Sequence, residues 1–512
     1  EEKATPISRT GSGWISISNL ACLLAIAAVP ANAAISETWD GGGGDNNWST
    51  AANWTNDTVP INQFVDFAGT TQTSTNNDIT AGKYIYEMRL NNTTSGQSFT
   101  LGGNSVFVHN AVRTSDVASG NITDVINLNI DTLNGNWIIG TNHDLIMNGT
   151  AGSGSDPLIK SGGGTLTLAG ANTYTGATTI NGGVLEVQGG AAIVDTGAVT
   201  VNSNGTFEVD NNETIGRIGG AGNVVLNANL TTGDTTNTEI SGDISGSGGL
   251  VKQGASTLTL SGDNSGFSGG ITLQDNGSRL ALNSANAAGT GDLAFNGFQT
   301  KLYNGASGPS TINNNISTAG WFYWESGSKA LEITGDWSNS SGVVWTNSSE
   351  TLTMSGVVSG TASTGFYGNG TIALTNANNT YTGNYNATLD STIQFNTIAN
   401  KSVNSSLGAG TQIIFDLASN QNFNGTFENI GVGGSTNRDV ILGQHNGTPW
   451  ARIDNNGTGA LDFNGTFENR SNAGATRELR LGGDYNGENT ISSVLSDGVG
   501  GGKLALTKDG DT

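Results

Sequence analysis

The segment Gly163–Val187 constrains the fold more than any other part of this chain. It contains the short runs Thr165–Leu168, Thr178–Ile180 and Val184–Val187, in which small polar and apolar residues alternate. Such alternation predicts β-strands, and the Gly and Asn residues between the runs predict tight corners. None of these runs can form a stable hairpin arm by itself, so each strand needs neighbours on both sides. The segment therefore predicts one coil of a solenoid.

The same order of runs and corners recurs along the chain. Ser256–Leu273 repeats it closely, Gly370–Gly383 repeats it in part, and Gly502–Thr512 matches the start of a further copy. Repeats at such spacings are typical of stacked architectures. Because the last copy is cut at Thr512, we expect the natural protein to continue past that residue.

A second repeat family lies near the end of the chain. Phe423–Asn429 returns as Phe463–Asn469, and each copy leads into a run that begins with Arg and an acid, Arg438–Leu442 and Arg477–Leu481. We expect these Arg and acid side chains to form ion pairs between neighbouring coils.

These motifs carry a family resemblance. The pattern at residues 164–185 resembles the autotransporter-associated β-strand repeat of bacterial surface and secreted proteins, and Thr38–Trp54 resembles the mature N-terminus typical of such proteins. The resemblance implies a parallel β-helix that is exported from a Gram-negative cell. It implies no activity, because the family name describes a scaffold.

The composition agrees with a solenoid. The chain has 78 Gly in 512 residues, and only 12% of its residues are charged. A hydrophobic content of 35% is low for one compact core of this length, whereas each coil of a β-helix buries only a few side chains. A disordered chain is the alternative for such a composition, but evenly placed runs such as Val106–Val108 and Val224–Leu226 argue against it. We therefore predict an all-β fold, a single-stranded parallel β-helix.

The start of the chain has the features of a secretory signal peptide. An apolar run, Leu20–Val29, follows Lys3 and Arg9 and precedes Pro30–Ala33, which supplies an Ala-x-Ala cleavage site. This run is too short to favour a membrane-spanning helix, which needs about 20 apolar residues. We predict a signal peptide at residues 1–33, an N-terminal cap region at 34–76 and a parallel β-helix passenger at 77–512. The one cysteine, Cys22, lies in the signal peptide, so the exported chain contains no disulfide.

The charge balance limits the class of partner. A formal net charge of −23 and a pI of about 4.2 argue against nucleic acid and anionic lipid. The basic residues are scattered thinly along the sequence. We expect neither nucleic-acid binding nor membrane insertion by this segment.

Catalytic residues are not singled out by any motif. Hydrolysis of a polysaccharide on a β-helix needs two carboxylates that face one cleft, and the available pairs are Asp210 with Glu213, Asp243 with Asp263, and Asp439 with Glu478. Solvated corner positions explain these carboxylates equally well. The histidines, at positions 109, 143 and 445, lack metal-like spacing. We predict no enzyme, no metal and no cofactor, and the alternative is a β-helical polysaccharide lyase or glycoside hydrolase.

Aromatic residues cluster within a few predicted coils, and they are the candidate contact residues: Trp321, Tyr323, Trp324, Trp337 and Trp345. Strand alternation directs the side chains of Trp321 and Tyr323 to one face and those of Phe322 and Trp324 to the other. Flat rings stack well on sugar faces, so a glycan or surface contact is one interpretation. An aromatic stack inside the helix or under a loop is the other.

The function that we predict is structural or adhesive. A rigid β-helix, displayed on or released from a Gram-negative cell surface, would carry binding features away from the cell. Its expected location is secreted or outer-membrane associated, after cleavage of the signal peptide. The expected partners are extracellular glycans or the surfaces of host or neighbouring cells, and the expected state is a monomer.

Overall fold

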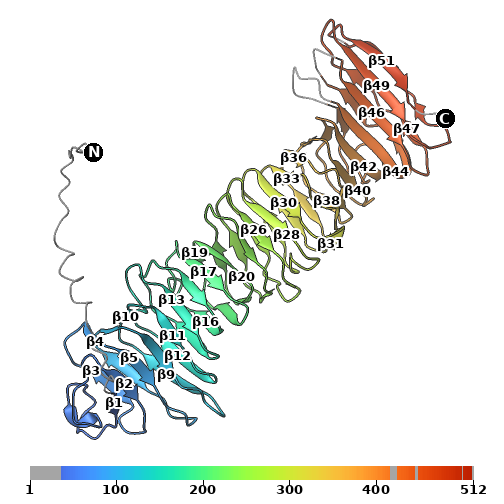
Figure 1. The fold of residues 1–512 in the computed structure, drawn as a ribbon. Coiled ribbons are helices and arrows are strands. Elements are labelled where there is room, and N and C mark those ends of the chain that lie inside the picture. Colours follow the sequence, from blue (N-terminus) through green and yellow to red (C-terminus); the bar gives the residue numbers. More distant parts are fainter. Residues whose placement is uncertain (1–35, 416–423, 444–447, 499, 510–512) are drawn as a thin grey trace, which may run out of the picture.

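The computed structural model describes residues 36–415, 424–443, 448–498 and 500–509. The predicted signal peptide, residues 1–33, lies outside the described residues. The chain forms an elongated rod with β1 (Ser36–Trp39) at one end and β51 (Lys503–Lys508) at the other (Figure 1). Within the described ranges the helical structure consists of a single 3-10 turn, Ala51–Asn53. The predicted all-β parallel β-helix is confirmed.

One sheet, called here the long sheet, runs along almost the whole rod and has 20 strands. Each of its strands pairs in parallel with the strands of the coils before and after it. In order, these are β1, β2 (Phe64–Phe67), β5 (Glu87–Leu90), β8 (Ala111–Thr114), β11 (Asn136–Ile138), β13 (Leu158–Ser161), β15 (Thr178–Ile180), β17 (Ala198–Val201), β20 (Arg217–Gly220), β23 (Thr238–Ile240), β26 (Thr257–Leu260), β28 (Arg279–Leu282), β30 (Thr300–Asn304), β33 (Phe322–Trp324), β36 (Val343–Thr346), β39 (Thr364–Tyr367), β41 (Tyr385–Ala387), β43 (Gln412–Phe415), β45 (Asp439–Leu442) and β48 (Phe467–Asn469).

A second side of the rod is built from two successive sheets. The first, called here the second sheet, contains β3 (Ser74–Asn77), β6 (Thr100–Gly103), β9 (Ile122–Ile126), β12 (His143–Met147), β14 (Thr165–Leu168), β16 (Gly183–Val187), β18 (Gly205–Val209), β21 (Asn223–Leu226) and β24 (Ile244–Ser245). The other, called here the C-terminal sheet, contains β31 (Ser310–Ile312), β34 (Leu331–Ile333), β37 (Leu352–Met354), β40 (Thr371–Leu374), β42 (Ser391–Thr397), β44 (Gly425–Thr436), β46 (Trp450–Asn455), β49 (Thr476–Gly482) and β51, and β44 also pairs with β47 (Leu461–Phe463), which pairs with β50 (Thr490–Ile491).

The third side is formed by shorter sheets. Near the N-terminal end it contains β4 (Lys83–Ile85), β7 (Val106–Val108) and β10 (Ile130–Thr132). In the middle of the rod it contains β19 (Glu213–Ile215), β22 (Leu230–Thr232), β25 (Leu250–Lys252), β27 (Ile271–Leu273), β29 (Leu293–Phe295), β32 (Ile316–Thr318), β35 (Trp337–Asn339) and β38 (Val358–Ser359).

The core lies inside the coils and is built by strand alternation. On the long sheet Leu258 lies opposite Leu280, and Leu280 lies opposite Leu302. All of these leucines are buried. Burying one such side chain contributes about 1.5–3 kcal/mol, so a single coil gains little and stability adds up through contacts with neighbouring coils.

The N-terminal end of the rod is closed by aromatic side chains. Trp39, Trp48, Trp54 and Phe67 are buried and in contact, with the rings of Trp39 and Trp54 perpendicular at 5.2 Å between centroids. An antiparallel bridge between Trp39 and Trp54 folds the chain back over the first coil. This arrangement covers an end that would otherwise expose unpaired backbone groups. The division between cap and passenger at residue 76 stays a prediction, since the long sheet already begins with β1.

Copies of one repeat lie on different sides of the rod. Thr165–Leu168 forms β14 in the second sheet, whereas the matching Thr257–Leu260 forms β26 in the long sheet. The shorter repeat behaves in the same way, because Phe427 lies in β44 of the C-terminal sheet and Phe467 lies in β48 of the long sheet. Each motif therefore specifies a strand and its inward residues, but not the side on which the strand lies.

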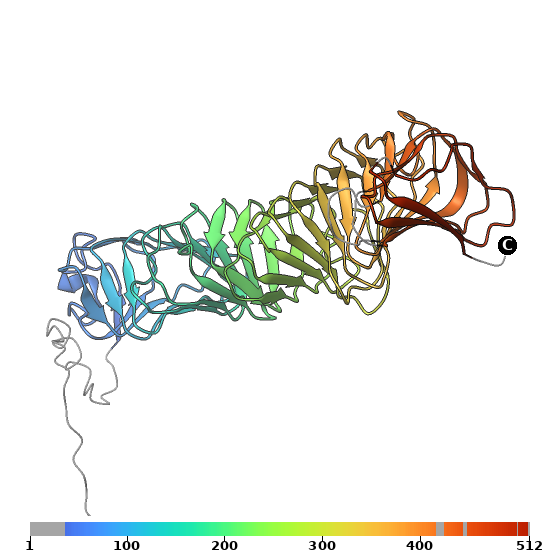
Figure 2. The same cartoon turned by 90° about the horizontal axis from the view of Figure 1, so that it is seen from above.

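The coils are longer at the C-terminal end than in the middle of the rod. Facing residues on the long sheet are 22 residues apart in the middle of the rod, as in the pair Thr257 and Arg279. Near the end they are 27 residues apart, as in Asp439 and Thr466. The last coils are turned relative to the rest of the rod (Figure 2).

Candidate functional site: an outer aromatic column

The outward positions of the long sheet carry an unusual column of side chains between β28 and β39. Reading across the strands, Arg279 lies opposite Lys301, Lys301 opposite Tyr323, Tyr323 opposite Trp345, and Trp345 opposite Tyr367. We call this set the outer column. Each member is partly exposed and alternates with buried residues on its strand, so the strands themselves hold the side chains in line.

The rings of the outer column stack on one another. The rings of Tyr323 and Trp345 are 5.6 Å apart with an angle of 2° between their planes, and those of Trp345 and Tyr367 are 5.2 Å apart at 29°. Trp345 therefore has a ring on each side. Because side chains stand roughly perpendicular to a sheet, the outward side of this stack consists of ring edges and phenol groups.

Two cations continue the outer column beyond the rings. The Arg279 Nε atom donates to Glu325, and the Lys301 Nζ atom lies 3.8 Å from the same carboxylate. The Arg279 guanidinium also lies over the ring of Tyr303, 4.4 Å from its centroid. Glu325 therefore holds both cations in place and neutralises only one of their two charges.

The phenol of Tyr323 keeps its proton in this setting. Partial burial raises its pKa above the ordinary value of 10, although a hydrogen bond with Gln299 acts in the opposite direction. The indole Nε1 of Trp345 is buried and has no hydrogen-bond partner within the described part of the chain. Tyr323 can therefore donate a hydrogen bond to a bound partner, whereas Trp345 contributes its ring.

The predicted contact residues separate into two groups. Trp321 is partly exposed and packs against Phe298, 4.5 Å between ring centroids, so Trp321, Tyr323 and Trp345 lie on the outside. Trp324 and Trp337 are buried in the core, where the Trp337 Nε1 atom donates to Thr318 Oγ1 at 3.1 Å. The structure therefore removes Trp324 and Trp337 from any contact surface. The interpretation as an inner aromatic stack applies to Trp324 and Trp337, and a contact role for Trp321, Tyr323 and Trp345 stays a prediction.

A second group of outer aromatic residues lies near the N-terminal end, and the sequence analysis missed it. Tyr84 stacks on Phe107 at 4.9 Å, and Tyr84 and Tyr86 both contact the His109 ring. The Tyr84 hydroxyl is 2.5 Å from His109 Nδ1. The sequence contained a signal for this group. Aromatic residues alternate with an apolar residue in Tyr84-Ile85-Tyr86, and a similar alternation follows one coil later in Phe107-Val108-His109.

The carboxylates named as catalytic candidates do not converge on a cleft. Asp210 accepts a hydrogen bond from Asn227, whereas Glu213 is buried and accepts from the backbone N–H groups of Ala192 and Ile193. Burial raises the pKa of Glu213, and this is the larger effect. Glu213 thus satisfies backbone groups inside the rod and cannot act together with Asp210 on an external substrate.

The other two carboxylate pairs also have structural partners. The Asp243 carboxylate accepts from the backbone N–H of Asp263 at an exposed corner. Asp439 pairs with Lys401 at 2.7 Å, and Glu478 pairs with Arg480 at 2.8 Å. These geometries explain the carboxylates as parts of corners and surface ion pairs.

Arg438, which precedes Asp439, differs from the prediction. Arg438 is fully buried, and its guanidinium donates to the backbone oxygens of Ala399 at 3.1 Å, Leu407 at 2.8 Å and Gly408 at 2.5 Å. Arg477 is buried as well. The predicted ion pair at Arg438 is wrong, because alternation directs Arg438 inward and Asp439 outward. The inward guanidinium instead holds the corner at residues 399–408.

The histidine in the middle of the second sheet has a partner from another coil. His143 and Asp124 are fully buried. The His143 Nε2 atom is 2.7 Å from Asp124 Oδ2, and the His143 Nδ1 atom is 3.1 Å from the backbone oxygen of Ser115. Asp144, next to His143 in sequence, contacts Asn121 instead. The His143–Asp124 pair is enclosed by protein and has no access to a substrate. No group of three or more His, Cys, Asp or Glu side chains suited to a metal ion occurs in the part of the chain that the structure describes.

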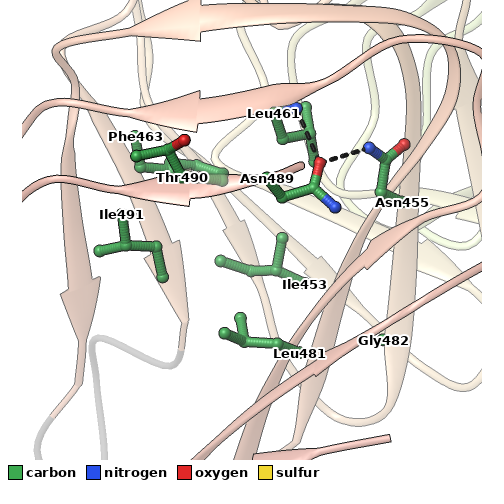
Figure 3. Close-up of a pocket in the computed structure, with 9 residues that line it drawn as sticks. All are labelled: Ile453, Asn455, Leu461, Phe463, Leu481, Gly482, Asn489, Thr490 and Ile491. Carbon is green, nitrogen blue, oxygen red and sulfur yellow. Dashed lines mark hydrogen bonds between the residues drawn. The ribbon is translucent and has the colours of Figure 1, made fainter. Parts of the chain in front are cut away.

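A small cavity of about 70 Å³ lies inside the last coils (Figure 3). Its lining is mainly apolar, with side chains such as Ile453, Leu481 and Ile491. The Asn489 side-chain oxygen accepts from Asn455 Nδ2 at 2.7 Å and from the Leu461 N–H at 2.9 Å. The cavity is partly open to solvent, because Asn489 and Thr490 in its lining are exposed, and the side-chain oxygen of Asn489 is already paired.

Comparison with known proteins agrees with the repeats in this architecture. The passenger-associated-transport-repeat family matches residues 158–187 and 250–278, the coils around β13–β16 and β25–β28. The chain carries passenger repeats. Its β-helix therefore resembles an autotransporter passenger in these coils, and the repeat copies predicted at residues 164–185 and 256–273 are confirmed.

A curated relative of the chain is the adhesin BmaC autotransporter of Brucella suis biovar 1 (strain 1330). It is 34% identical over 153 residues, which are 28% of this chain and 4% of the relative. The passenger-like β-helix is thus distantly related to an adhesin, of which it spans a small part. No solved structure matches the chain significantly. Among the described residues, no helix has the length and apolar character needed to cross a membrane.

Proposed function

We propose that this chain is the exported, elongated part of a surface adhesin and that the outer column is its contact face. The observation that carries the proposal is the stacked set Tyr323, Trp345 and Tyr367 on the outside of the long sheet. A core does not require these rings, since the inward positions of the same strands already bury Phe322, Val344 and Phe366.

The mechanism of such a protein is geometric. The rod separates the contact face from the cell, and its side chains act by contact rather than by chemistry. Aromatic residues suit this role because their rings are rigid and lose little conformational entropy on binding. The partners would be extracellular glycans or the surfaces of host or neighbouring cells, met by a monomeric rod that is secreted or held at the outer membrane after removal of its signal peptide.

An enzymatic role finds less support in the geometry. The carboxylates that could act in pairs are engaged in corners, ion pairs or the core, as described above. The relation to an adhesin favours a role in binding. We therefore propose that neither nucleic acid binding nor catalysis is a function of this chain.

Binding of the exported chain to a panel of immobilised polysaccharides tests the proposal. The variant Tyr323→Ala/Trp345→Ala should lose at least tenfold in affinity for the polysaccharides that the unchanged chain binds, because aromatic residues commonly dominate contact energies. The matched control is Thr179→Ala/Thr200→Ala, which alters outward positions of the same sheet in the repeat coils. Equal binding by the aromatic variant and the control would contradict the proposal, provided that both show unchanged circular dichroism.

A further inference from the structure

We propose that the outer column binds an acidic linear polysaccharide, with carboxylate groups on its sugar residues, that lies along the axis of the rod. This inference rests on the proposed adhesive function and specifies the chemistry of its partner. It follows from the way in which the rings are presented and from the charges that continue the column.

The stacked rings present their positive sides outward. An aromatic ring carries partial negative charge on its faces and partial positive charge at its edge. Because Trp345 lies between Tyr323 and Tyr367, its faces are directed toward its neighbours and its edge toward solvent. The phenol of Tyr323 adds an O–H donor. This surface therefore favours negatively charged oxygen atoms over the flat apolar face of a neutral sugar.

The cations at one end of the outer column strengthen this preference. The Lys301 and Arg279 side chains are partly exposed, at 38% and 26% of their surfaces, and together with Glu325 they leave one net positive charge. This local excess occurs on a chain with a formal charge of −23. The basic site attracts an anionic partner, whereas the acidic remainder of the rod repels it. Such a partner can therefore bind only at the basic site.

The spacing of the outer column suits a polymer of sugars. Successive members lie on adjacent parallel strands, so they are about 4.8 Å apart along the rod axis. This spacing is comparable to the length of one sugar residue in an extended polysaccharide. One acidic sugar could therefore lie opposite each coil. Duplex DNA carries a charge about every 1.7 Å of its axis, and so dense a polyanion would meet the negative charge of the rest of the rod.

The test uses polygalacturonic acid and its fully methyl-esterified form, which share one backbone and differ in charge. The exported chain should bind polygalacturonic acid at least tenfold more tightly than the ester, and raised salt should weaken that binding because the charges are exposed. The variants Lys301→Gln and Arg279→Gln should each weaken binding to the acid by about tenfold, the usual scale for a charged hydrogen bond, and leave binding to the ester unchanged. Lys503→Gln is the matched control, since it removes the same charge from an exposed position on β51.

The outcomes separate this inference from the adhesive role. Equal binding of both polymers, no binding of the acid, or tighter binding to duplex DNA would overturn the inference. The inference would also be overturned if Lys301→Gln bound polygalacturonic acid as tightly as the unchanged chain, with a melting temperature equal to that of the Lys503→Gln control. Equal affinities for the acid and the neutral ester, both lost in Tyr323→Ala/Trp345→Ala, would leave the adhesive role standing while the charge preference falls.

Discussion

The long sheet is built in the same way in two regions, but the regions present different surfaces. In the repeat coils its outward positions hold Ile159, Thr179 and Thr200, whereas from the sixth strand after that of Thr200 they hold Tyr323 and Trp345. The inward positions are buried in both regions and mainly apolar, with exceptions such as Thr178 and Lys160. The difference shows that alternation separates stability from contact: one set of side chains holds the coils together, and the other is free to vary.

The strongest test of this separation compares two neighbours on β33. Phe322→Ala should lower the free energy of unfolding of the surrounding coils by about 3–5 kcal/mol, because it opens a cavity in the core. Tyr323→Ala should cost about 1 kcal/mol or less, since it removes only an outer ring contact. Hydrogen exchange on β30 and β36 measures both effects locally. Similar losses for the two variants would show that the outer rings also stabilise the rod.

The repeat coils contain buried cations that should make their stability depend on pH. Burial lowers the pKa of Lys160 and of Lys252 to about 8, from an ordinary value of 10.5. Each Nζ atom donates to corner oxygens, Lys160 to Gly182 at 2.9 Å and Lys252 to Gly254 at 3.1 Å. Between these pKa values the unfolded chain binds more protons than the folded chain, so stability rises with pH in this window.

The expected rise is about 1–2 kcal/mol per lysine between pH 8 and about pH 9.5. Burial raises the pKa of Tyr381 to about 12. Tyr381 therefore lowers the stability with rising pH, but only above about pH 10, beyond the window of the lysines. Denaturant titrations at several pH values, with Lys160→Met/Lys252→Met beside the partly exposed control Lys301→Met, measure the effect. A rise of equal size in both variants would show that the buried lysines are not its source.

The smallest expected effect concerns the amide ladders at the corners of the repeat coils. Asn202 Nδ2 donates to Asn181 Oδ1 at 2.7 Å from one exposed corner to the next. Asn202→Ala should cost about 0.5–1 kcal/mol, the net value of one such hydrogen bond. Ser203→Ala, in the same exposed turn, is the control. A loss above about 2 kcal/mol would mean that the ladder holds the corner itself.

Much of the fold could be predicted from the sequence, because a period of two assigns each residue to the inside or the outside. This rule correctly separates Tyr323 from Trp324. It could also have directed Lys160 and Arg438 inward, since each lies two positions from a buried apolar residue, Leu158 and Val440 respectively. It cannot say on which side of the rod a strand lies. That choice depends on the lengths of all preceding corners, so equivalent repeats occupy different sheets.

The candidate site was predicted only in part, because it depends on how neighbouring coils are aligned. Alternation along β33 and β36 places Tyr323 and Trp345 on the outside. Their alignment with Lys301 and Tyr367 depends on the register between coils, which a single strand does not contain. The partner of His143 was missed likewise, because Asp124 belongs to the preceding coil.

The direction of the hydrogen bonds in the long sheet has a mechanical consequence. The strands lie across the rod, so the bonds between them run along its axis and bear a pulling force in series. A tethered rod under tension would therefore open one coil at a time instead of breaking at once. Each coil of 22 residues adds only about 4.8 Å to the folded rod, but releases about 70–80 Å of chain when it opens. The rod would lengthen in steps and absorb work. The maximum force on the bond between the outer column and its partner would therefore be lower.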